Sequence, residues 1–433
     1  MDENSPPALL LTTWSDTEAA MVRELLATYG IRCSVSSEVP HSVLPLTVDG
    51  LGAVRLHVSV AVLGEARAIL AAHRSAGSSP PSGGTTKGLV VPMPVRVESA
   101  TRIDLAGGTL DIWPLYLFLE DPVTVNMAID LMTVAEVGVL PGSLRITLQT
   151  DDLGQTVRAT STAELDLNGP LGLLARLVAF FRPQGGVRVR TAASVPAGSG
   201  LGGSSALAVA VAVGLQRLAG QPAAGHGAPT LARELADLEA QVLGVPTGIQ
   251  DHFPALLGGV QQLSFGPGQV RTRRLPVSMA AVTERLVLVY EGATRSSGIS
   301  NFDMVRRFLE GERTARDGLA GVARASGALA QALERGDLDA AGEAMEAEMT
   351  SRRQLSPAVL TPITERLFTV AHQEGALAAK VCGAGGGGCS VYWVRAGRRE
   401  AVGHALEKAG ARLLPFNGVE QGLVTDASLP DNA

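Results

Sequence analysis

Cysteine is scarce in this chain of 433 residues, which contains only Cys33, Cys382 and Cys389. Their number is odd and no two have CxxC or metal-type spacing, so nothing indicates a disulfide scaffold or a cysteine-based metal centre. The sequence also lacks an apolar run long enough for a membrane span, and its opening, MDENSPPALL, has neither the basic nor the long apolar segment of a secretory signal. These absences predict a cytoplasmic protein.

Lysine is equally scarce and occurs only at Lys87, Lys380 and Lys408. A GxxxxGK[ST] phosphate loop is therefore excluded, and any nucleotide phosphate must be held in another way. The formal net charge is -6 and the acidic residues are spread along the chain. This distribution lacks the basic surface that binds nucleic acid or an anionic membrane, so we expect a small-molecule partner.

A segment rich in glycine, serine, proline and threonine, GSSPPSGGTTKG, has the composition of a flexible linker. It separates a small head from a large body, and the length of the body favours more than one domain. We predict a head over residues 1–76, a linker over 77–92, and a body that divides near Pro276 into 93–275 and 276–433.

The apolar patterns alternate between strand and helix and predict an α+β fold. In the head, ALLLTTW and IRCSVSS are expected strands, with helices over 16–29 and 63–73. In the body we expect strands at PVRVESATRID, SLRITLQT, TVRATST, VRVRTAASV and RLVLVYEG, and long alanine-rich helices from residue 302 to about 353.

The strongest local signal is VPAGSGLGGSSALAVAVAVGLQRL, an alternating strand that leads through a glycine-rich loop into an apolar helix. Glycines let the backbone approach an anion, and free N–H groups at a helix start attract phosphate without a lysine. Ser204 and Ser205 stand at this start, where a hydroxyl can cap the helix, bind phosphate or be a ligand of Mg2+. A tight turn with a serine cap is the simpler alternative, but the density of glycine and serine favours an anion site.

Two further segments carry carboxylates beside turns. ATRIDLAGGTLDIW puts Arg102 and Asp111 around a glycine pair, where Asp111 could accept two sugar hydroxyls or cap a hairpin turn. In EAQVLGVPTGIQDHFPALLGG, Glu239 could be one charge of a solvated helix face, and Asp251 could cap a helix beginning at His252. We interpret His252 as a rim residue, a weak base or a tolerated surface residue, and expect it not to be catalytic.

Near the C-terminus, KVCGAGGGGCSVYW has four consecutive glycines, whose cost in chain entropy needs a reason in a folded domain. The loop permits either close packing of two elements or close approach to a ligand. We interpret Cys389 as a small core residue. In EGATRSSGISN, Arg295 is either a contact for an anionic substrate group or an exposed structural arginine.

These segments together resemble the GHMP kinases. PAGSGLGGSSA resembles their ATP loop, PxxxGLGSSA, and the additional Gly203 is similar to the branch of the heptose 7-phosphate kinases and fucokinase-like enzymes. GIQDHF resembles the family's GxQDQY, and KVCGAGGGG resembles its KxxGAGGGG. AGGTLD resembles the heptose kinase AGGGTD but places Leu110 beside the aspartate. The resemblance spans about Pro94 to Val424.

The resemblance implies a two-domain body, with a first domain like ribosomal protein S5 domain 2 and a ferredoxin-like second domain. It implies that ATP and Mg2+ are bound and that Asp251 and Arg102 are catalytic. Asp251 would be a general base, or an anion that orients the hydroxyl while Arg102 eases its deprotonation. The implied metal ligands are Ser205 and Glu239. The implied ATP-binding residues are Pro196, Gly198, Ser199, Gly200, Leu201, Gly202, Gly203, Ser204, Ser205 and Ala206. The implied substrate-binding residues are Gly107, Gly108, Asp111, Arg295, Gly385 and Gly386.

The function that follows is phosphorylation of a sugar hydroxyl, at the anomeric position of a heptose phosphate, fucose or a related sugar. Two alternatives stay open: a regulator that senses ATP and sugar, and a kinase for a non-sugar acceptor such as mevalonate. The head resembles short bacterial domains described as putative signal-transducing proteins, in LLTTWSDTEAAMVRELLATYGIRCSV and SVLPLTVDG. It suggests a protein partner or regulator acting through residues 1–76.

Overall fold

The computed structural model describes residues 7–13, 22–23, 25–27, 29, 31–37, 54–76, 94–222, 227–292 and 298–425. The chain forms two compact units, 1–90 and 91–433. Most of the head helix expected over 16–29, and the whole linker expected over 77–92, lie outside the described residues. None of the described helices combines the length and apolar character that a membrane crossing requires.

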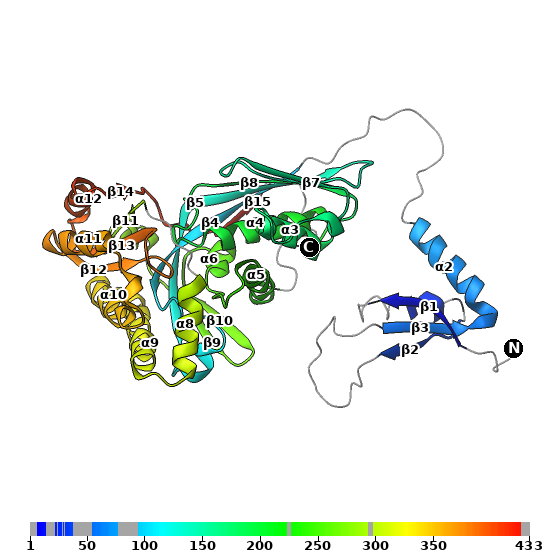
Figure 1. The fold of residues 1–433 in the computed structure, drawn as a ribbon, viewed down its shortest axis with the longest axis horizontal. Helices are drawn as coiled ribbons and strands as arrows, with labels where there is room; N and C mark the ends of the chain where they lie inside the picture. Colours follow the sequence, from blue (N-terminus) through cyan, green and yellow to red (C-terminus); the bar gives the residue numbers. More distant parts are fainter. Residues whose placement is uncertain are drawn as a thin grey trace. The chain divides into compact units, whose positions relative to one another are not determined.

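The first unit contains an antiparallel three-stranded sheet of order β1-β3-β2 (Figure 1). Its elements are β1 (Pro7–Thr13), β2 (Ser34–Ser37), β3 (Val54–Ser59), the short 3-10 helix η1 (Val60–Val62) and α2 (Leu63–Ala76). Leu26, Leu56 and Val58 form part of its small apolar core. The two predicted strands and the second predicted helix of the head are confirmed.

The second unit contains an eight-stranded sheet in which the order β10-β9-β5-β8-β6-β7 is extended by β4, which pairs with β5 and β15. β6 and β8 run parallel, and the other pairs are antiparallel. Its strands are β4 (Val95–Ala106), β5 (Val123–Leu140), β6 (Ile146–Thr150), β7 (Gln155–Ala159), β8 (Gly186–Ala193), β9 (Val260–Gly266), β10 (Gln269–Arg274) and β15 (Leu423–Thr425).

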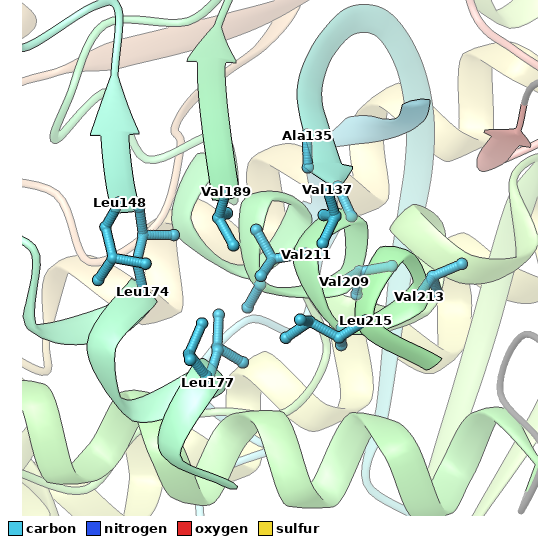
Figure 2. Packing of buried hydrophobic residues seen from close by; sticks show 14 of the residues in the cluster. Ala135, Val137, Leu148, Leu174, Leu177, Val189, Val209, Val211, Val213 and Leu215 are labelled. Carbon is cyan, nitrogen blue, oxygen red and sulfur yellow. The ribbon is translucent and has the colours of Figure 1, made fainter. Parts of the chain in front are cut away.

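Three helices pack against α4 (Gly203–Leu218), the helix that follows the glycine-rich loop. They are α3 (Gly172–Phe181), α5 (Ala228–Leu243) and α6 (His252–Leu257). α4 is apolar over most of its length because it is buried against the sheet on one side and neighbouring helices on the other. Figure 2 shows Val211 and Leu215 of α4 between Val137 of β5 and Leu177 of α3. This packing holds α4 in place, and the helix begins where the predicted phosphate loop ends.

A four-stranded sheet of order β12-β13-β11-β14 forms the other part of the unit. Its strands are β11 (Leu286–Tyr290), β12 (Ala376–Val381), β13 (Cys389–Val394) and β14 (Arg412–Leu413). The accompanying helices are α7 (Met279–Thr283), α8 (Gly298–Leu309), α9 (Arg313–Glu334), α10 (Leu338–Arg353), α11 (Pro362–Gln373) and α12 (Arg399–Lys408). Short 3-10 helices are η2 (Leu115–Phe118), η3 (Thr162–Glu164) and η4 (Pro357–Val359).

The α+β class predicted from the sequence is confirmed. One apolar cluster joins β4 and β5 to β11, β13, α9 and α10, with Ile103, Met127, Leu329 and Trp393 among its members. The boundary near Pro276 stays a prediction, and the cluster shows that residues on its two sides share a core. β4 is consequently buried from Ser99 to its end at Ala106. Side chains of this buried stretch reach the candidate site from inside the protein.

Candidate functional site

A cavity of about 420 Å³ lies where the three glycine-containing segments and the GIQDHF turn come together. This volume falls in the range of pockets that hold small molecules, about 300–1,000 Å³. The predicted site residues that line it are Arg102, Gly108, Asp111, Pro196, Gly198, Ser199, Gly200, Gly202, Gly203, Ser204, Ser205, Glu239, Asp251 and Gly385. Segments far apart in the sequence thus line the same cavity.

Four predicted contact residues do not belong to this lining. Leu201 and Ala206 are fully buried in apolar clusters, so their side chains support the loop from behind. The N–H of Gly107 donates to Glu348 (3.2 Å), and that of Gly386 donates to the carbonyl of Val359 (2.9 Å). These N–H groups face the protein rather than the cavity, and contact of the four residues with a ligand stays a prediction. Arg295 lies outside the described residues.

The glycine loop connects β8 to α4 and depends on backbone conformations that other residues rarely adopt. Gly200 and Gly202 have φ angles of +78° and +72°. A Cβ at Gly200 would lie 2.3 Å from the carbonyl oxygen of Cys382, so the loop packs directly on the chain that follows β12. Gly202 is the N-cap of α4 and supplies no capping side chain, which leaves the first N–H groups of the helix available to an anion.

The alternative of a simple serine cap is not supported, because Ser205 makes a different contact. Its hydroxyl donates to Glu239 Oε2 at 2.7 Å, and both residues line the cavity. Glu239 comes from the end of α5 and is buried rather than exposed on a solvated face. Burial opposes its charge, yet the contacts with His252, Ser204 and Ser205 hold the pKa of Glu239 below its usual value.

His252 is fully buried, which corrects its interpretation as a rim or surface residue. Its Nε2 lies 3.0 Å from Glu239 Oε2, and its Nδ1 lies 3.2 Å from the carbonyl of Ile249. Burial disfavours the imidazolium, but Glu239 outweighs this effect and raises the pKa of His252. We infer that His252 holds the Glu239 carboxylate in place from behind the cavity.

Asp251 forms a two-pronged ion pair with Arg102. Arg102 Nε donates to Oδ1 (2.9 Å) and Nη2 to Oδ2 (2.7 Å), while Nη1 donates to the carbonyl of Gly200 (2.5 Å). Although Asp251 is the N-cap residue of α6, its side chain makes no capping hydrogen bond. Burial opposes the charge of Arg102, but the attraction of Asp251 and Asp104 raises its pKa above the usual value. The pair therefore ties a charged carboxylate to the glycine loop.

Asp111 is buried in the turn after β4 and accepts two backbone hydrogen bonds. Thr109 N donates to Oδ1 (3.1 Å) and Gln250 N to Oδ2 (2.9 Å). Burial is the main reason that the pKa of Asp111 is raised to about 6, and the charges of Asp251 and Asp104 add to it. Each oxygen keeps a second lone pair for a ligand hydroxyl.

Sequence reasoning missed a buried charge network beside the cavity. Lys380 on β12 donates to Asp104 Oδ2 on β4 (2.8 Å), and Arg352 on α10 donates to Glu348 Oε1 (2.5 Å). Arg352 also donates to the carbonyl of Gly108 (2.6 Å). The four charged side chains are almost completely buried. They connect α10 and β12 to the glycine turn at 107–108.

Two signals in the sequence could have found this network. Asp104 interrupts an otherwise apolar strand end, and Lys380 is a rare lysine inside a strongly apolar segment. A charge that must lie inside a core requires an opposite charge nearby. The contact of α10 with these strands joins segments far apart in the sequence, however. No local pattern therefore indicates which charges pair with Asp104 and Lys380.

Two family models match this chain, the GHMP kinases N terminal domain over residues 171–259 and the GHMP kinases C terminal domain over 329–412. The Arabidopsis thaliana bifunctional fucokinase/GDP-fucose pyrophosphorylase is 28% identical over 69% of this chain, which spans only 30% of that longer protein. The Campylobacter jejuni D-glycero-alpha-D-manno-heptose 7-phosphate kinase is 25% identical over 76% of this chain and 98% of its own length.

Solved structures share the fold. A D-glycero-D-manno-heptose 1-phosphate kinase from Bacteriodes thetaiotaomicron aligns with a TM-score of 0.61 at 21% identity, over 76% of this chain and 98% of its own. A Lactococcus lactis galactokinase complexed with galactose aligns with a TM-score of 0.64 at 18% identity, over 82% of this chain and 99% of its own.

Proposed function

Because the chain carries both domains of the GHMP kinases, we propose that it is an ATP-dependent kinase that phosphorylates a hydroxyl group of a sugar. The observation that supports this most is the single cavity that brings the glycine loop, the Ser205–Glu239 pair and the Arg102–Asp251 pair together. In this proposal the glycine loop binds the triphosphate, the Ser205–Glu239 pair binds the divalent ion, and the Arg102–Asp251 pair binds the acceptor hydroxyl.

The glycine loop is suited to the phosphates of ATP. Uncapped N–H groups at the start of α4 supply positive potential without a lysine. Apolar side chains from the β6–β7 turn, the start of α3 and the end of α5 also line the cavity, and they offer a surface for the adenine base. These side chains are Leu153, Leu171, Leu173, Leu174, Leu243 and Val245.

The residues present fit a magnesium ion held jointly with nucleotide phosphates. Ser205 and Glu239 provide two oxygen donors 2.7 Å apart, and oxygen ligands are those that Mg2+ prefers. Among the described residues no group of three or more His, Cys, Asp or Glu could hold a metal alone, which agrees with a site completed by phosphate and water. When bound, the ion would supply positive charge to the phosphoryl oxygens.

The Arg102–Asp251 pair is suited to the acceptor hydroxyl. The hydroxyl oxygen forms a bond to the γ-phosphorus as the bond between that phosphorus and ADP breaks, and the hydroxyl proton is released. Asp251 is only partly exposed and can orient the hydroxyl or take its proton through a lone pair not used by Arg102. Arg102 holds the carboxylate at the glycine loop, next to the expected γ-phosphate.

The names of the relatives support a sugar as the acceptor, with the anomeric hydroxyl of a heptose phosphate, fucose or a related sugar as the finer proposal. Release of ADP by the purified chain with Mg-ATP should be measured over a panel of sugars, sugar phosphates and mevalonate. We expect turnover with at least one sugar or sugar phosphate. Absence of turnover with every sugar, while ATP binds, would favour the sensing alternative. A cytoplasmic location and a protein partner of residues 1–76 remain proposals.

Acceptor binding should depend on pH through Asp111. Its pKa of about 6 means that the carboxylate is charged above this pH and protonated below it. As pH rises from 5 to 7, we expect KM for the sugar to fall, because the charged oxygens accept hydroxyl hydrogen bonds more strongly. The measurement is KM at half-unit pH steps for wild type and for Asp111→Asn. A KM that falls equally steeply in the variant would assign the dependence to another group.

Replacing Glu239 with glutamine should weaken the use of Mg-ATP. The amide keeps the shape but loses the charge that faces the expected ion, so we expect kcat/KM for ATP to fall about 10²-fold. Titration of Mg2+ at fixed ATP should show a higher half-saturating concentration. Asp237→Asn removes an exposed charge from the same helix and is the control. Equal Mg2+ titrations of wild type and Glu239→Gln would remove Glu239 from the metal site.

A further inference from the structure

We propose that the acceptor is a neutral sugar, bound through hydroxyl groups that donate to Asp104 and Asp111, rather than a sugar that already carries a phosphate. This inference rests on the proposed kinase function and narrows its substrate class. It is carried by the charges that line the cavity and by one buried carboxylate oxygen of Asp104.

The described lining of the cavity is acidic. Its carboxylates are Asp104, Asp111, Asp152, Glu239 and Asp251. Arg102 is the only arginine, lysine or histidine among the described lining residues, and Asp251 engages it in two hydrogen bonds. A phosphate group on the acceptor normally requires an arginine or lysine that is not already neutralised. The described lining offers none.

The two cations just behind the lining are also engaged. Lys380 is fully buried and donates to Asp104 Oδ2 and, at 3.4 Å, to the carbonyl of Val381. Arg352 donates to Glu348, to the Gly108 carbonyl and to the Thr109 hydroxyl. Its guanidinium thus faces protein acceptors on several sides. Turning either cation toward a ligand would leave a buried carboxylate without its partner.

Backbone donors differ between the two sides of the cavity. On the nucleotide side, the start of α4 presents N–H groups without a capping side chain, which suits the phosphates of ATP. Around Asp111, by contrast, the N–H groups of Thr109 and Gln250 are already donated to its carboxylate. These two N–H groups are therefore not offered to a phosphate on the acceptor.

Asp104 supplies the positive argument for hydroxyl groups. It is fully buried, lines the cavity, and none of the described residues donates a hydrogen bond to its Oδ1. Burial opposes ionisation, but the attraction of Lys380, Arg352 and Arg102 lowers the pKa of Asp104, so the carboxylate only accepts hydrogen bonds. A sugar hydroxyl can donate to this oxygen, whereas a phosphate dianion placed beside it has no proton to donate and is repelled by the carboxylate.

The space around Asp104 is restricted by its neighbours. A Cβ at Gly108 would lie 2.2 Å from Asp104 Oδ2 and 2.9 Å from Gln250 Nε2. A side chain at this position would therefore collide with Asp104 and Gln250. We expect a compact ring with small substituents to fit here better than one that carries a bulky charged group.

Matched acceptors test the inference with the wild-type full chain. ADP release should be compared for fucose, for mannose against mannose 6-phosphate, and for D-glycero-D-manno-heptose against its 7-phosphate. We expect kcat/KM to be at least about tenfold higher for the neutral member of each pair that is turned over, the effect of about one favourable charged hydrogen bond. Equal or better turnover of the phosphorylated members would overturn the inference and leave the kinase proposal standing. No turnover with any sugar, while ATP binds, would overturn both.

Variants identify Asp104 as the cause. Asp104→Asn should raise KM for the neutral sugar about tenfold and change KM for ATP less than about twofold, while Asp237→Asn should change neither. A series of deoxy sugars provides a second measurement in wild type alone, so the test survives if the variant fails to fold. Removal of one hydroxyl from the sugar should lower kcat/KM of the wild type about tenfold. The same removal should have a smaller effect on kcat/KM of Asp104→Asn. If no deoxy sugar lowers kcat/KM of the wild type more than about twofold, Asp104 does not accept a hydrogen bond from a hydroxyl of the acceptor.

Discussion

Replacement of Asp251 by asparagine is expected to lower kcat about 10³-fold while ATP binding stays within about twofold of wild type, the loss typical of removing a general base. The amide keeps the size of the carboxylate but cannot take up a proton, and it can satisfy only part of the paired donors of Arg102. The nucleotide site should survive, because the glycine loop is also fixed by Gly200 against Cys382 and by the buried α4. Single-turnover phosphoryl transfer and equilibrium binding of a nonhydrolysable ATP analogue give the two quantities.

The matched control for this variant is Asp237→Asn, which makes the same chemical change at an exposed position of α5. Its kcat should equal that of wild type. If Asp251→Asn also kept more than about a tenth of the wild-type kcat, activation of the acceptor hydroxyl would not depend on Asp251. Loss of ATP binding together with kcat would instead point to a structural role for the Arg102–Asp251 pair.

Replacement of Lys380 by methionine is expected to lower the free energy of unfolding by about 3–5 kcal/mol, the cost of leaving a buried charge without its partner. Lys380 donates to Asp104 and lies 3.9 Å from Glu348 Oε1, and all three side chains are inaccessible to solvent. Methionine fills much of the same volume, so lost packing contributes little. Equilibrium denaturation in urea measures the change.

Lys408→Met is the control for this second variant, since Lys408 is exposed at the end of α12. Its effect should stay within about 0.5 kcal/mol. A loss below about 1 kcal/mol for Lys380→Met would mean that the network is not needed for stability. In that case the contact between β12 and β4 would have to be attributed to the apolar cluster around them.

Much of the fold could be predicted wherever residues close in sequence determine the structure. The expected strands at 94–104 and 285–292 and the transition from strand to loop to helix around residue 200 appear as β4, β11 and the β8–α4 connection. β5 was not predicted, although it is the longest strand of the sheet. Its first half, VTVNMAIDL, alternates apolar residues with mostly polar ones, so the periodicity of the sequence could have found this strand.

The candidate site shows the same division. The glycine loop and the three carboxylates Asp111, Glu239 and Asp251 could be found from local motifs, and they line one cavity. The interpretation of His252 as a rim or surface residue is wrong because its partner, Glu239, belongs to another helix, and no local pattern indicates this contact. Asp104 was not singled out because its significance depends on Lys380, which is distant in sequence and opposite it in the fold. Long-range pairing of charges is the part that a single sequence does not specify.

The most direct test of the kinase proposal is to follow the phosphorus of ATP by 31P NMR in a mixture of the purified chain, Mg-ATP and a neutral sugar. We predict that the γ-phosphate signal is replaced by the signal of a sugar phosphomonoester in an amount equal to the ADP formed. Conversion only to inorganic phosphate, or no conversion with any sugar while ATP is bound, would contradict transfer to a sugar hydroxyl.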